Sequence, residues 1–290
     1  MKVAILTDSN SGISQEEAEK LGIYVLPMPV LVDGEEYYED INLTQEEFFE
    51  KIKEDIDIST SQPNIYTVGE KWDELLKTYE EIVYIPMSAS LSSSCEVAAN
   101  FSKDYHGQVQ VVDNRRISVT QKQSVFDAIY LAKQGKSAAE IKKYLENEAS
   151  QNSIYIMLDT LKYLKKGGRL TPAVAAIGTM LRIKPILQIQ GGKLDRFSQV
   201  MTSIQGKKKM IEQIIKELDS RFAIPLQEGR IVISMAYTNC KDKALEFQKE
   251  VETALEKYNL KVTFVDPLPI SIACHIGSGA LALTISAKII

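Results

Sequence analysis

Four short segments of this sequence combine small hydroxyl residues, glycine or an acid, and each follows an apolar, strand-like run. They are Thr7-Asp8-Ser9-Asn10, Thr60-Ser61-Gln62-Pro63, Ser88-Ala89-Ser90-Leu91-Ser92-Ser93-Ser94 and His275-Ile276-Gly277-Ser278-Gly279. In an open α/β sheet, the carboxyl ends of the strands form the crevice in which ligands bind. Because hydroxyl and backbone N–H groups donate hydrogen bonds, segments gathered at such an edge would suit an anionic ligand.

Each segment also has an ordinary structural interpretation. Ser92 to Ser94 stand before an apparent helix, Cys95 to Phe101, where free N–H groups and the helix dipole favour an anion. A serine run before a helix is, however, commonly a cap, and Thr60 to Pro63 is typical of a turn. Asp8 and His275 could serve as hydrogen-bonded structural residues. Only the combination of the four segments therefore indicates a site.

A short basic stretch, Lys165-Lys166-Gly167-Gly168-Arg169, contains two glycines that permit backbone conformations closed to other residues. It is either a solvated loop, a lid over a ligand or a docking surface for an anionic partner. Cys95 lies in the first turn of a predicted helix, where a thiol can become acidic. No base is placed beside it, so we do not assign a reactive cysteine.

Metal and cofactor sites are not expected. Cys95, Cys240 and Cys274 are far apart, and His106 and His275 are the only histidines, so neither residue type has metal-ligand spacing. Three separated cysteines fit a reducing compartment, and we expect a cytoplasmic protein. The apolar run at the N-terminus is too short for a signal peptide, and no run of about 18 apolar residues predicts a membrane span.

The elements that must position these segments are easiest to recognise in the first half. Short β-branched runs, such as Val3 to Leu6, Tyr24 to Val32, Ile82 to Ile85 and Val109 to Val112, alternate with amphipathic segments such as Gln15 to Leu21. This alternation predicts a parallel sheet covered by helices. Capping-box spacing predicts four helix starts, at Ser14 with Glu17, Thr44 with Glu47, Thr67 with Glu70 and Ser137 with Glu140.

The pattern changes near Ser153. A strand-like run to Leu158 is followed by the basic stretch, a helix from Pro172 capped by Thr171, and a strand from Lys184 to Gln190. Gly191-Gly192 then predicts a hairpin and antiparallel pairing. Further helices are expected at Lys207 to Leu218 and Asp242 to Tyr258, and strands at Arg230 to Met235 and Lys261 to Val265. We predict an α/β protein of two domains, residues 1–153 with a parallel sheet and residues 154–290 with a mixed sheet.

Length and composition agree with two packed domains. The chain has 290 residues, 44% hydrophobic and 25% charged, which is ordinary for a globular protein with a sizeable core. The net charge is -5, and the basic residues are dispersed among acids. No basic patch suited to a phosphate backbone is present, so nucleic acid is not an expected partner.

Six motifs, taken in chain order, resemble the DegV family. They are Thr7-Asp8-Ser9, Thr60-Ser61-Gln62-Pro63, the serine loop from Ser88, Leu164-Lys165-Lys166-Gly167-Gly168-Arg169, Lys184-Pro185-Ile186-Leu187 and His275-Ile276-Gly277. The resemblance runs from Met1 to the C-terminal strand. It implies two α/β domains with a long-chain fatty acid, such as palmitate or oleate, bound between them.

The resemblance also implies a role without catalysis. The protein would be the fatty-acid-binding subunit that presents a carboxylate to a separate fatty acid kinase, one similar to dihydroxyacetone kinases, which makes acyl phosphate for phospholipid synthesis. Carried over motif by motif, the implied carboxylate-binding residues are Thr60, Ser92, Ser93, His275 and Gly277. Arg169 is implied to lie near the ligand or to dock the kinase.

This chain departs from the family pattern at several positions. Ser93 and Cys95 stand in a serine loop that usually runs Ser-Gly-Thr-aromatic, Ser278 stands where proline is common, and Ala282 where glycine is common. If the glycine serves a positive φ, Ser93 must be strained or adopt another turn. These departures bear on carboxylate geometry and acyl-chain preference.

Apolar burial should dominate affinity for such a ligand. Three or four charge-assisted hydrogen bonds contribute roughly 5–10 kcal/mol before costs, whereas a sixteen-carbon tail offers about 12 kcal/mol at ~0.8 kcal/mol per CH₂. Hydroxyl donors would orient the carboxylate without the bidentate clamp of an arginine. Val174 to Ile177 and Ile183 to Ile189 are candidate apolar elements for the tail, although such residues usually just fill a core.

A second function class stays open from the sequence. Ser92, Asp113 and His275 follow the chain order of an α/β-hydrolase triad, so the protein could hydrolyse acyl esters. The serine loop, however, lacks the Gly-x-Ser-x-Gly elbow that exposes a hydrolase nucleophile. A phosphate-binding enzyme is a third option, but no Walker-type glycine and lysine pattern is present.

Overall fold

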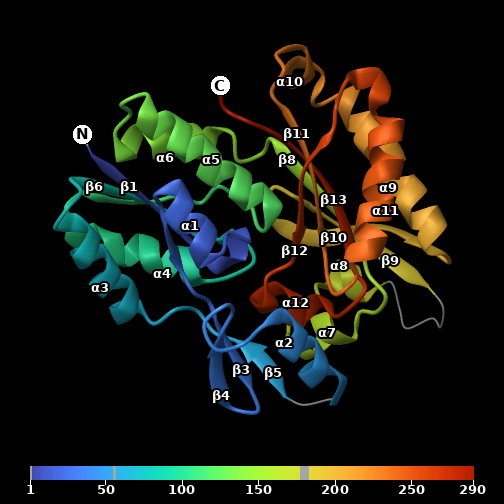
Figure 1. The fold of residues 1–290 in the computed structure, drawn as a ribbon, viewed down its shortest axis with the longest axis horizontal. Helices are drawn as coiled ribbons and strands as arrows, with labels where there is room; N and C mark the ends of the chain where they lie inside the picture. Colours follow the sequence, from blue (N-terminus) through green and yellow to red (C-terminus); the bar gives the residue numbers. More distant parts are fainter. Residues whose placement is uncertain (1, 55–56, 177–182) are drawn as a thin grey trace.

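The computed structural model describes residues 2–54, 57–176 and 183–290 of the chain. It has two α/β domains that lie side by side, the N-terminal one at the left and the C-terminal one at the right of Figure 1. A small third sheet, with its strands β3, β4 and β5, lies below them in this view. The prediction of two α/β domains, one with a parallel and one with a mixed sheet, is confirmed.

The N-terminal domain is built on a parallel sheet of order β2-β1-β6-β7. These strands are Tyr24–Leu26, Val3–Asp8, Glu81–Ile85 and Val109–Val111. Because alternate side chains point to opposite faces, apolar residues on both faces require helices on both. One face is covered by α1 (Gln15–Leu21), α5 (Val119–Lys133) and α6 (Ala138–Asn147), the other by α3 (Ile65–Leu76) and α4 (Ser94–Phe101).

The third sheet is antiparallel, with order β4-β3-β5. Its strands are Glu35–Tyr38, Pro29–Val32 and Ile58–Thr60, and it packs with α2 (Gln45–Lys51). The same apolar cluster takes in α12 (Ile270–Ile276), which comes from the far end of the chain. Thr60, the last residue of β5, is thereby brought to the domain boundary.

The C-terminal domain has a mixed sheet of order β10-β9-β8-β13-β11-β12. The strands are Lys193–Val200, Lys184–Gln190, Asn152–Met157, Leu281–Ala287, Ile231–Tyr237 and Val262–Pro267. The helices of this part of the chain include α7 (Lys162–Lys166), α8 (Pro172–Ala175), α9 (Ser203–Leu218), α10 (Ala223–Gln227) beside α9, and α11 (Lys241–Ala254).

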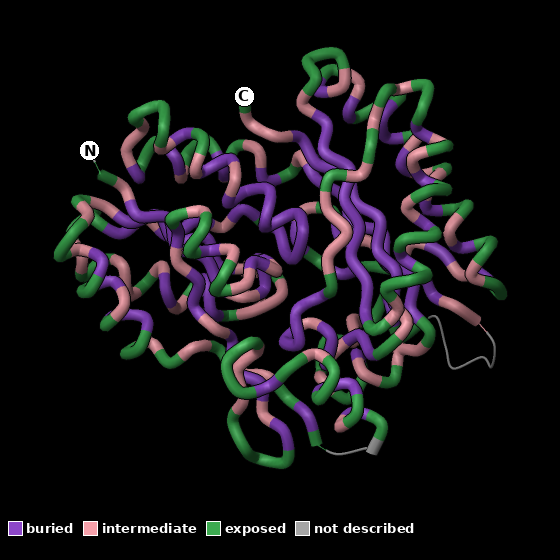
Figure 2. Tube along the Cα trace, in the orientation of Figure 1, coloured by how far each residue is buried: buried purple, intermediate pink, exposed green. Residues whose placement is uncertain are grey.

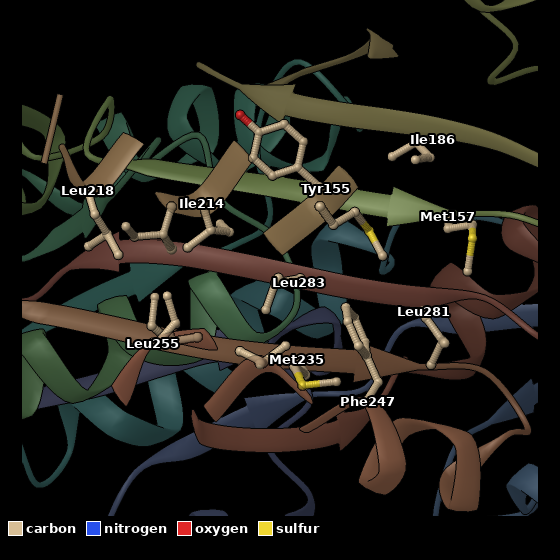
Figure 3. Packing of buried hydrophobic residues seen from close by; sticks show 14 of the residues in the cluster. Tyr155, Met157, Ile186, Ile214, Leu218, Met235, Phe247, Leu255, Leu281 and Leu283 are labelled. Atoms are coloured by element: carbon tan, nitrogen blue, oxygen red, sulfur yellow. The ribbon is translucent and has the colours of Figure 1, made fainter. Parts of the chain in front are cut away.

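The two faces of this sheet pack differently. One face, with Tyr155, Met235 and Leu283, packs against α9 and α11, whose Ile214 and Phe247 complete the cluster in Figure 3. The other face, with Ile154 and Ile156, turns toward the N-terminal domain. The buried strands run through the middle of the molecule, as Figure 2 shows.

Helix α5 joins the two domains. Lys122 Nζ donates to Glu17 on α1 and to Asp266 on β12, each at 3.0 Å. Phe126 stacks on Phe264 of β12, with ring centroids 5.7 Å apart. Through these ion pairs and this aromatic pair, α5 contacts α1 in the N-terminal domain and β12 in the C-terminal domain.

The predicted helix starts are mostly correct. Capping boxes form at Thr44 and Ser137, and the Ser14 side chain accepts from Glu17 N. The start at Thr67 is wrong, because Asn64 caps α3 by accepting from Tyr66 N, which leaves Thr67 inside the helix. Thr202 starts α9 with an unpredicted capping box to Gln205.

The predicted strands and hairpin also formed, with two corrections. The run Tyr24 to Val32 divides into β2 and β3, which belong to different sheets. Lys165 and Lys166 of the basic stretch lie in the last turn of α7 and not in a loop. The predicted boundary between residues 153 and 154 falls within β8 and stays a prediction. Among the helices described, none is long and apolar enough to cross a membrane.

Candidate ligand-binding site

A cavity of about 1010 Å³ lies between the two domains. Residues of all parts of the fold line it, including Thr60 on β5, Ile117 before α5, Ile156 on β8 and Ala282 on β13. Its volume is at the upper end of the range of about 300–1,000 Å³ for small-molecule sites. Exposed residues, among them Gln62, also line it, so the cavity opens to solvent.

Thr60 and His275 meet at the cavity wall, although 215 residues separate them in the chain. Thr60 Oγ1 and His275 Nε2 share a hydrogen bond of 3.0 Å. Helix α12 is positioned by the burial of Ile270 and Cys274 against the small sheet. Glu39 fixes its start by accepting from Ile270 N at 2.8 Å.

His275 is an uncharged hydrogen-bonding group at neutral pH. Burial, and then the positive charge of Arg169, lowers the pKa of His275 to about 4. Its second nitrogen, Nδ1, is buried without a hydrogen-bond partner and faces Gly167, where an added Cβ would lie 2.1 Å away. The ring therefore needs a glycine at position 167. In the tautomer with a proton on Nε2, His275 donates to Thr60 Oγ1 and leaves the Thr60 hydroxyl proton for a ligand.

The serine loop is held open toward the cavity by two buried or half-buried acids. Asp8 accepts from Met87 N at 2.9 Å, and Asp113 accepts from Ala89 N at 3.2 Å. Full burial raises the pKa of Asp8, as the leading cause, while its hydrogen bonds oppose that rise. Asp8 therefore acts here as a structural acid that anchors the loop.

Within this loop, Ser92 and Ser93 both line the cavity. The Ser92 hydroxyl donates to Ser94 Oγ at 3.0 Å, and the Ser93 hydroxyl donates to Gln62 Oε1 at 3.2 Å. Ser93 has φ -70°, so this chain uses a turn that needs no glycine at that position. The strained alternative expected for Ser93 does not occur.

Arg169 supplies the positive charge nearest to His275. It is exposed, it lines the cavity, and its Nη1 donates to Gly167 O at 2.7 Å. Lys193 of β10 lines the same cavity. Arg169 is therefore close to the ligand space and also reaches the surface, so both of its predicted roles stay open.

Gly277 lies apart from the other predicted carboxylate-binding residues. It is absent from the cavity wall, its N–H donates to Ala273 O at 2.7 Å, and its carbonyl accepts from Thr238 Oγ1 at 2.6 Å. Its φ of +80° and the Tyr163 ring, 2.4 Å from where a Cβ would be, account for the glycine. In this conformation the residue shapes the end of α12.

The apolar wall comes from the inward face of the C-terminal sheet. On β13 and β11 this face carries small residues, with Ala282 opposite Ala236 and Thr284 opposite Ser234, while Leu283 points to the other side. Small side chains cannot fill the space up to the N-terminal domain, so a cavity remains.

The predicted tail elements are only partly in this wall. Ile189 lines the cavity, Leu187 and Val174 are buried in the cluster behind it, and Ile186 faces the opposite side of the sheet. Ile177 lies outside the described residues. Other apolar residues of the wall are Ile154, Ile156, Leu164 and Leu194, none of which was predicted to contact the tail.

The residues of the hydrolase alternative are not assembled as a triad. Across the described ranges, no hydrogen bond joins Ser92, Asp113 and His275; Ser92 bonds Ser94, Asp113 bonds backbone N–H groups and His275 bonds Thr60. Cys95 is also unsuited to nucleophilic chemistry, because burial, followed by the charge of Asp113, raises its pKa to about 12. The described residues contain no cluster of three or more metal-ligating side chains.

Asn10, Ser118 and Ser271 are among the polar residues of the cavity for which no role was predicted. Asn10 belongs to a segment noted in the sequence, but Ser118 and Ser271 gave no signal. A serine at a helix start is so common that spacing alone does not distinguish a cap from a ligand contact.

Comparison with known proteins agrees with this arrangement. Residues 2–288 match the family model described as "Uncharacterised protein, DegV family". A DegV domain-containing protein of Staphylococcus aureus is 30% identical over 99% of each chain. Another, of Clostridium perfringens, is 31% identical over 97% of this chain and 96% of its own.

Solved structures show the same fold. The structure described as fatty acid binding of a DegV family protein from Thermus thermophilus has a TM-score of 0.85, is 27% identical, and covers 99% of this chain and 100% of its own. DegV from Bacillus subtilis, described as a fatty acid binding protein, has a TM-score of 0.84 at 27% identity, with the same coverage.

Proposed function

The chain belongs to the DegV family, and from this premise we propose that it binds a long-chain fatty acid in the cavity between its domains and presents the carboxylate to a fatty acid kinase. The observation that carries the proposal is the Thr60–His275 pair beside an apolar cavity of about 1010 Å³. The described fatty acid binding of the Thermus thermophilus and Bacillus subtilis proteins supports it.

The polar end of the cavity suits a carboxylate head group. Thr60, Ser92, Ser93 and His275 offer neutral donors there, and Arg169 adds a positive charge. Gln62, Ser93 and Arg169 are exposed, so a carboxylate at this end is accessible from outside. Gly277 has a lesser role, because its N–H is already bonded to Ala273.

The ligand would be held mainly by its tail and oriented by its head group. A buried tail contributes about 0.8 kcal/mol per CH₂, which over sixteen carbons exceeds what a few hydrogen bonds provide. A binding protein of this kind needs no catalytic group of its own. The kinase would supply phosphoryl transfer, and the acyl phosphate would enter phospholipid synthesis in the cytoplasm.

The proposal is tested by ligand extraction and binding. Protein purified from cells should release a free fatty acid when its organic extract is analysed by mass spectrometry. Thr60→Val should weaken palmitate binding about three- to tenfold, whereas Thr60→Ser, which keeps the hydroxyl, should retain most of the affinity. A ligand-free protein that binds neither palmitate nor oleate would refute the proposal.

The hydrolase alternative makes an opposite prediction for Ser92. Because the Ser92 hydroxyl bonds Ser94 and no base accepts its proton, a fluorophosphonate probe should leave it unlabelled. Stoichiometric labelling at Ser92, with turnover of acyl esters, would favour the hydrolase.

A further inference from the structure

We propose that the cavity contains a second polar subsite, formed by Asn10, Ser118 and Ser271, that binds a neutral oxygen substituent on the ligand's chain. The subsite rests on the proposed function and extends its ligand class to hydroxy and oxo fatty acids. It lies at the N-terminus of α5, a helix of 15 residues.

The first observation is the hydroxyl of Ser118. Ser118 lines the cavity and is 5% exposed, yet its side chain does not cap α5 and makes no hydrogen bond within the described ranges. A buried hydroxyl without a partner costs free energy. Its position at the cavity wall lets a ligand atom satisfy it.

The second observation is the amide of Asn10, which is fully buried and lines the same cavity. Its Oδ1 accepts from Ser271 Oγ at 2.8 Å, and its backbone carbonyl accepts from Ser118 N at 2.9 Å, so the three residues form one group. Asn10 Nδ2 has no hydrogen-bond partner. The same amide also interacts with the Asp8 carboxyl, but an amide nitrogen has two N–H donors, so at least one is left without an acceptor.

The Asp8 carboxyl group limits which ligand chemistry fits. Asp8 is fully buried beside Asn10 and accepts from Asn10 N at 3.1 Å. A second carboxylate placed at the subsite would be buried beside this acid, where an ionised group loses its hydration. A hydroxyl or carbonyl oxygen can accept from Asn10 and Ser118 without adding charge.

The position of the subsite fixes where that oxygen lies on the chain. Ser271 and His275 are four residues apart on α12, a separation of about 6 Å along the helix axis. With the carboxylate near His275, the subsite is reached within the carboxyl half of a long acyl chain. The wall beyond it is apolar, with Ile154, Ile156 and Ile189.

The test compares palmitate with a positional series of hydroxypalmitates by isothermal titration calorimetry. At least one isomer hydroxylated in the carboxyl half should bind about three- to tenfold more tightly than palmitate, and isomers hydroxylated near the methyl end should bind more weakly. Ser118→Ala breaks no hydrogen bond of the fold. In this variant the tightest-binding hydroxypalmitate and palmitate should have nearly equal dissociation constants. Asn10→Leu provides a second variant of similar volume with the same expected loss of preference.

The matched control is Thr253→Ala, which removes an exposed hydroxyl on α11 and should leave the affinity ratio unchanged. If palmitate binds but no hydroxypalmitate binds more tightly, the subsite is refuted while the proposed function stands. A preference that survives both Ser118→Ala and Asn10→Leu would also refute it. If neither ligand class binds, the proposed function fails and the subsite fails with it.

Discussion

Ser92 and Arg169 illustrate how single residues at the head-group end can serve different purposes. Ser92→Ala removes one hydroxyl donor, while the apolar wall keeps its larger contribution to binding. Phosphoryl transfer instead needs the attacking oxygen held in near-attack geometry, where a small misplacement costs far more rate than affinity. We expect Ser92→Ala to lower kinase-dependent acyl-phosphate formation by a larger factor than it lowers fatty acid binding.

This prediction is checked by measuring two quantities for the same variants: fatty acid occupancy of the protein, and acyl-phosphate formation in the presence of the partner kinase. Arg169→Ala is the contrasting variant: if the exposed guanidinium faces the kinase, occupancy stays while the apparent affinity between the two proteins falls. An equal loss of binding and activity in Ser92→Ala would show that the serine loop is an affinity element.

The protonation of His275 should be visible in the stability of the protein. Its pKa is lowered from 6.5 to about 4, so between these values the unfolded state binds more protons than the folded state. Stability from this residue is therefore complete above about pH 6.5 and is lost as the pH falls through 4. His275→Gln should remove this pH dependence of the unfolding free energy, which amounts to roughly 3 kcal/mol at most.

Urea unfolding of both proteins from pH 4 to 7 measures this difference. The comparison must be between variants, because burial raises the pKa of Glu39 to about 7 and of Asp127 to about 6. Those two acids make stability fall as the pH rises, and they are common to both proteins. Equal pH slopes with and without His275 would contradict the prediction.

At the residue scale, the sequence located most of the site but could not supply its electrostatics. Thr60, Ser92, Ser93, His275 and Arg169 follow from family motifs, and all of them line the cavity. The unprotonated state of His275 depends on burial by elements distant in the chain, which no local pattern reveals. The resemblance implied that Gly277 binds the carboxylate, but Gly277 does not line the cavity and its N–H donates to Ala273 O.

Among the elements, β13 decides the shape of the apolar wall. Ala282→Leu adds three carbons to a strand face that borders the cavity and should shorten the space available to an acyl chain. Loss of each buried CH₂ contact costs ~0.8 kcal/mol, about fourfold in affinity. We expect palmitate to be weakened far more than a medium-chain acid such as decanoate.

A chain-length series of fatty acids, titrated by calorimetry, provides the measurement. Leu283→Ala is the matched control one residue along β13, because Leu283 points into the opposite cluster. It should cost about 2–5 kcal/mol of unfolding free energy without changing the order of chain lengths bound. An unaltered chain-length preference in Ala282→Leu would place the tail elsewhere.

Helices and strands were predicted correctly where neighbouring residues in the sequence determine their ends. The predictions failed where tertiary packing selects between two possible ends or two possible sheets. The hairpin of β9 and β10 follows from Gly191-Gly192, both of which have positive φ. The α3 start was misplaced because Asn64 and Thr67 are both plausible caps, and only packing selects between them. The division of Tyr24 to Val32 between two sheets is a tertiary choice that an apolar run does not encode.

On the scale of the whole molecule, Lys122 holds the domains together. It is 6% exposed in its side chain and pairs with Glu17 and Asp266 on opposite sides of the boundary. Removing Lys122 leaves Glu17 and Asp266 unpaired, and because their side chains are 35% and 23% exposed the cost should be about 1–3 kcal/mol, less than for a fully buried pair. Lys122→Met should lower the unfolding free energy by an amount of this order and weaken palmitate binding through looser docking.

Denaturant unfolding with and without palmitate tests this effect. Lys20→Met is the control, since Lys20 forms an exposed pair with Glu16 on α1 that should be worth little. Partial recovery of stability in Lys122→Met combined with Asp266→Asn would assign the loss to unpaired charge. No loss in Lys122→Met would mean that packing of Phe126 on Phe264 suffices.

The two-domain arrangement could be predicted from element alternation, and the family resemblance implied a ligand between the domains, but residue spacing alone could not predict the cavity. The positions of Thr60 and His275 in the sequence do not indicate that their side chains are in contact. Small residues such as Ala236 are common in strands, so their presence does not predict a cavity. Only the register of β11 with β13 puts Ala236 and Ala282 side by side.

The sheet order also has a consequence for folding during synthesis on the ribosome. Strand β13 lies between β8 and β11, so these two strands are made before the neighbour that joins them exists. His275 emerges 215 residues after Thr60, which at about 5–20 residues per second is a delay of roughly 10–40 s. Throughout that interval the nascent chain lacks His275, so a captured fatty acid would mark a chain whose two domains have finished assembling.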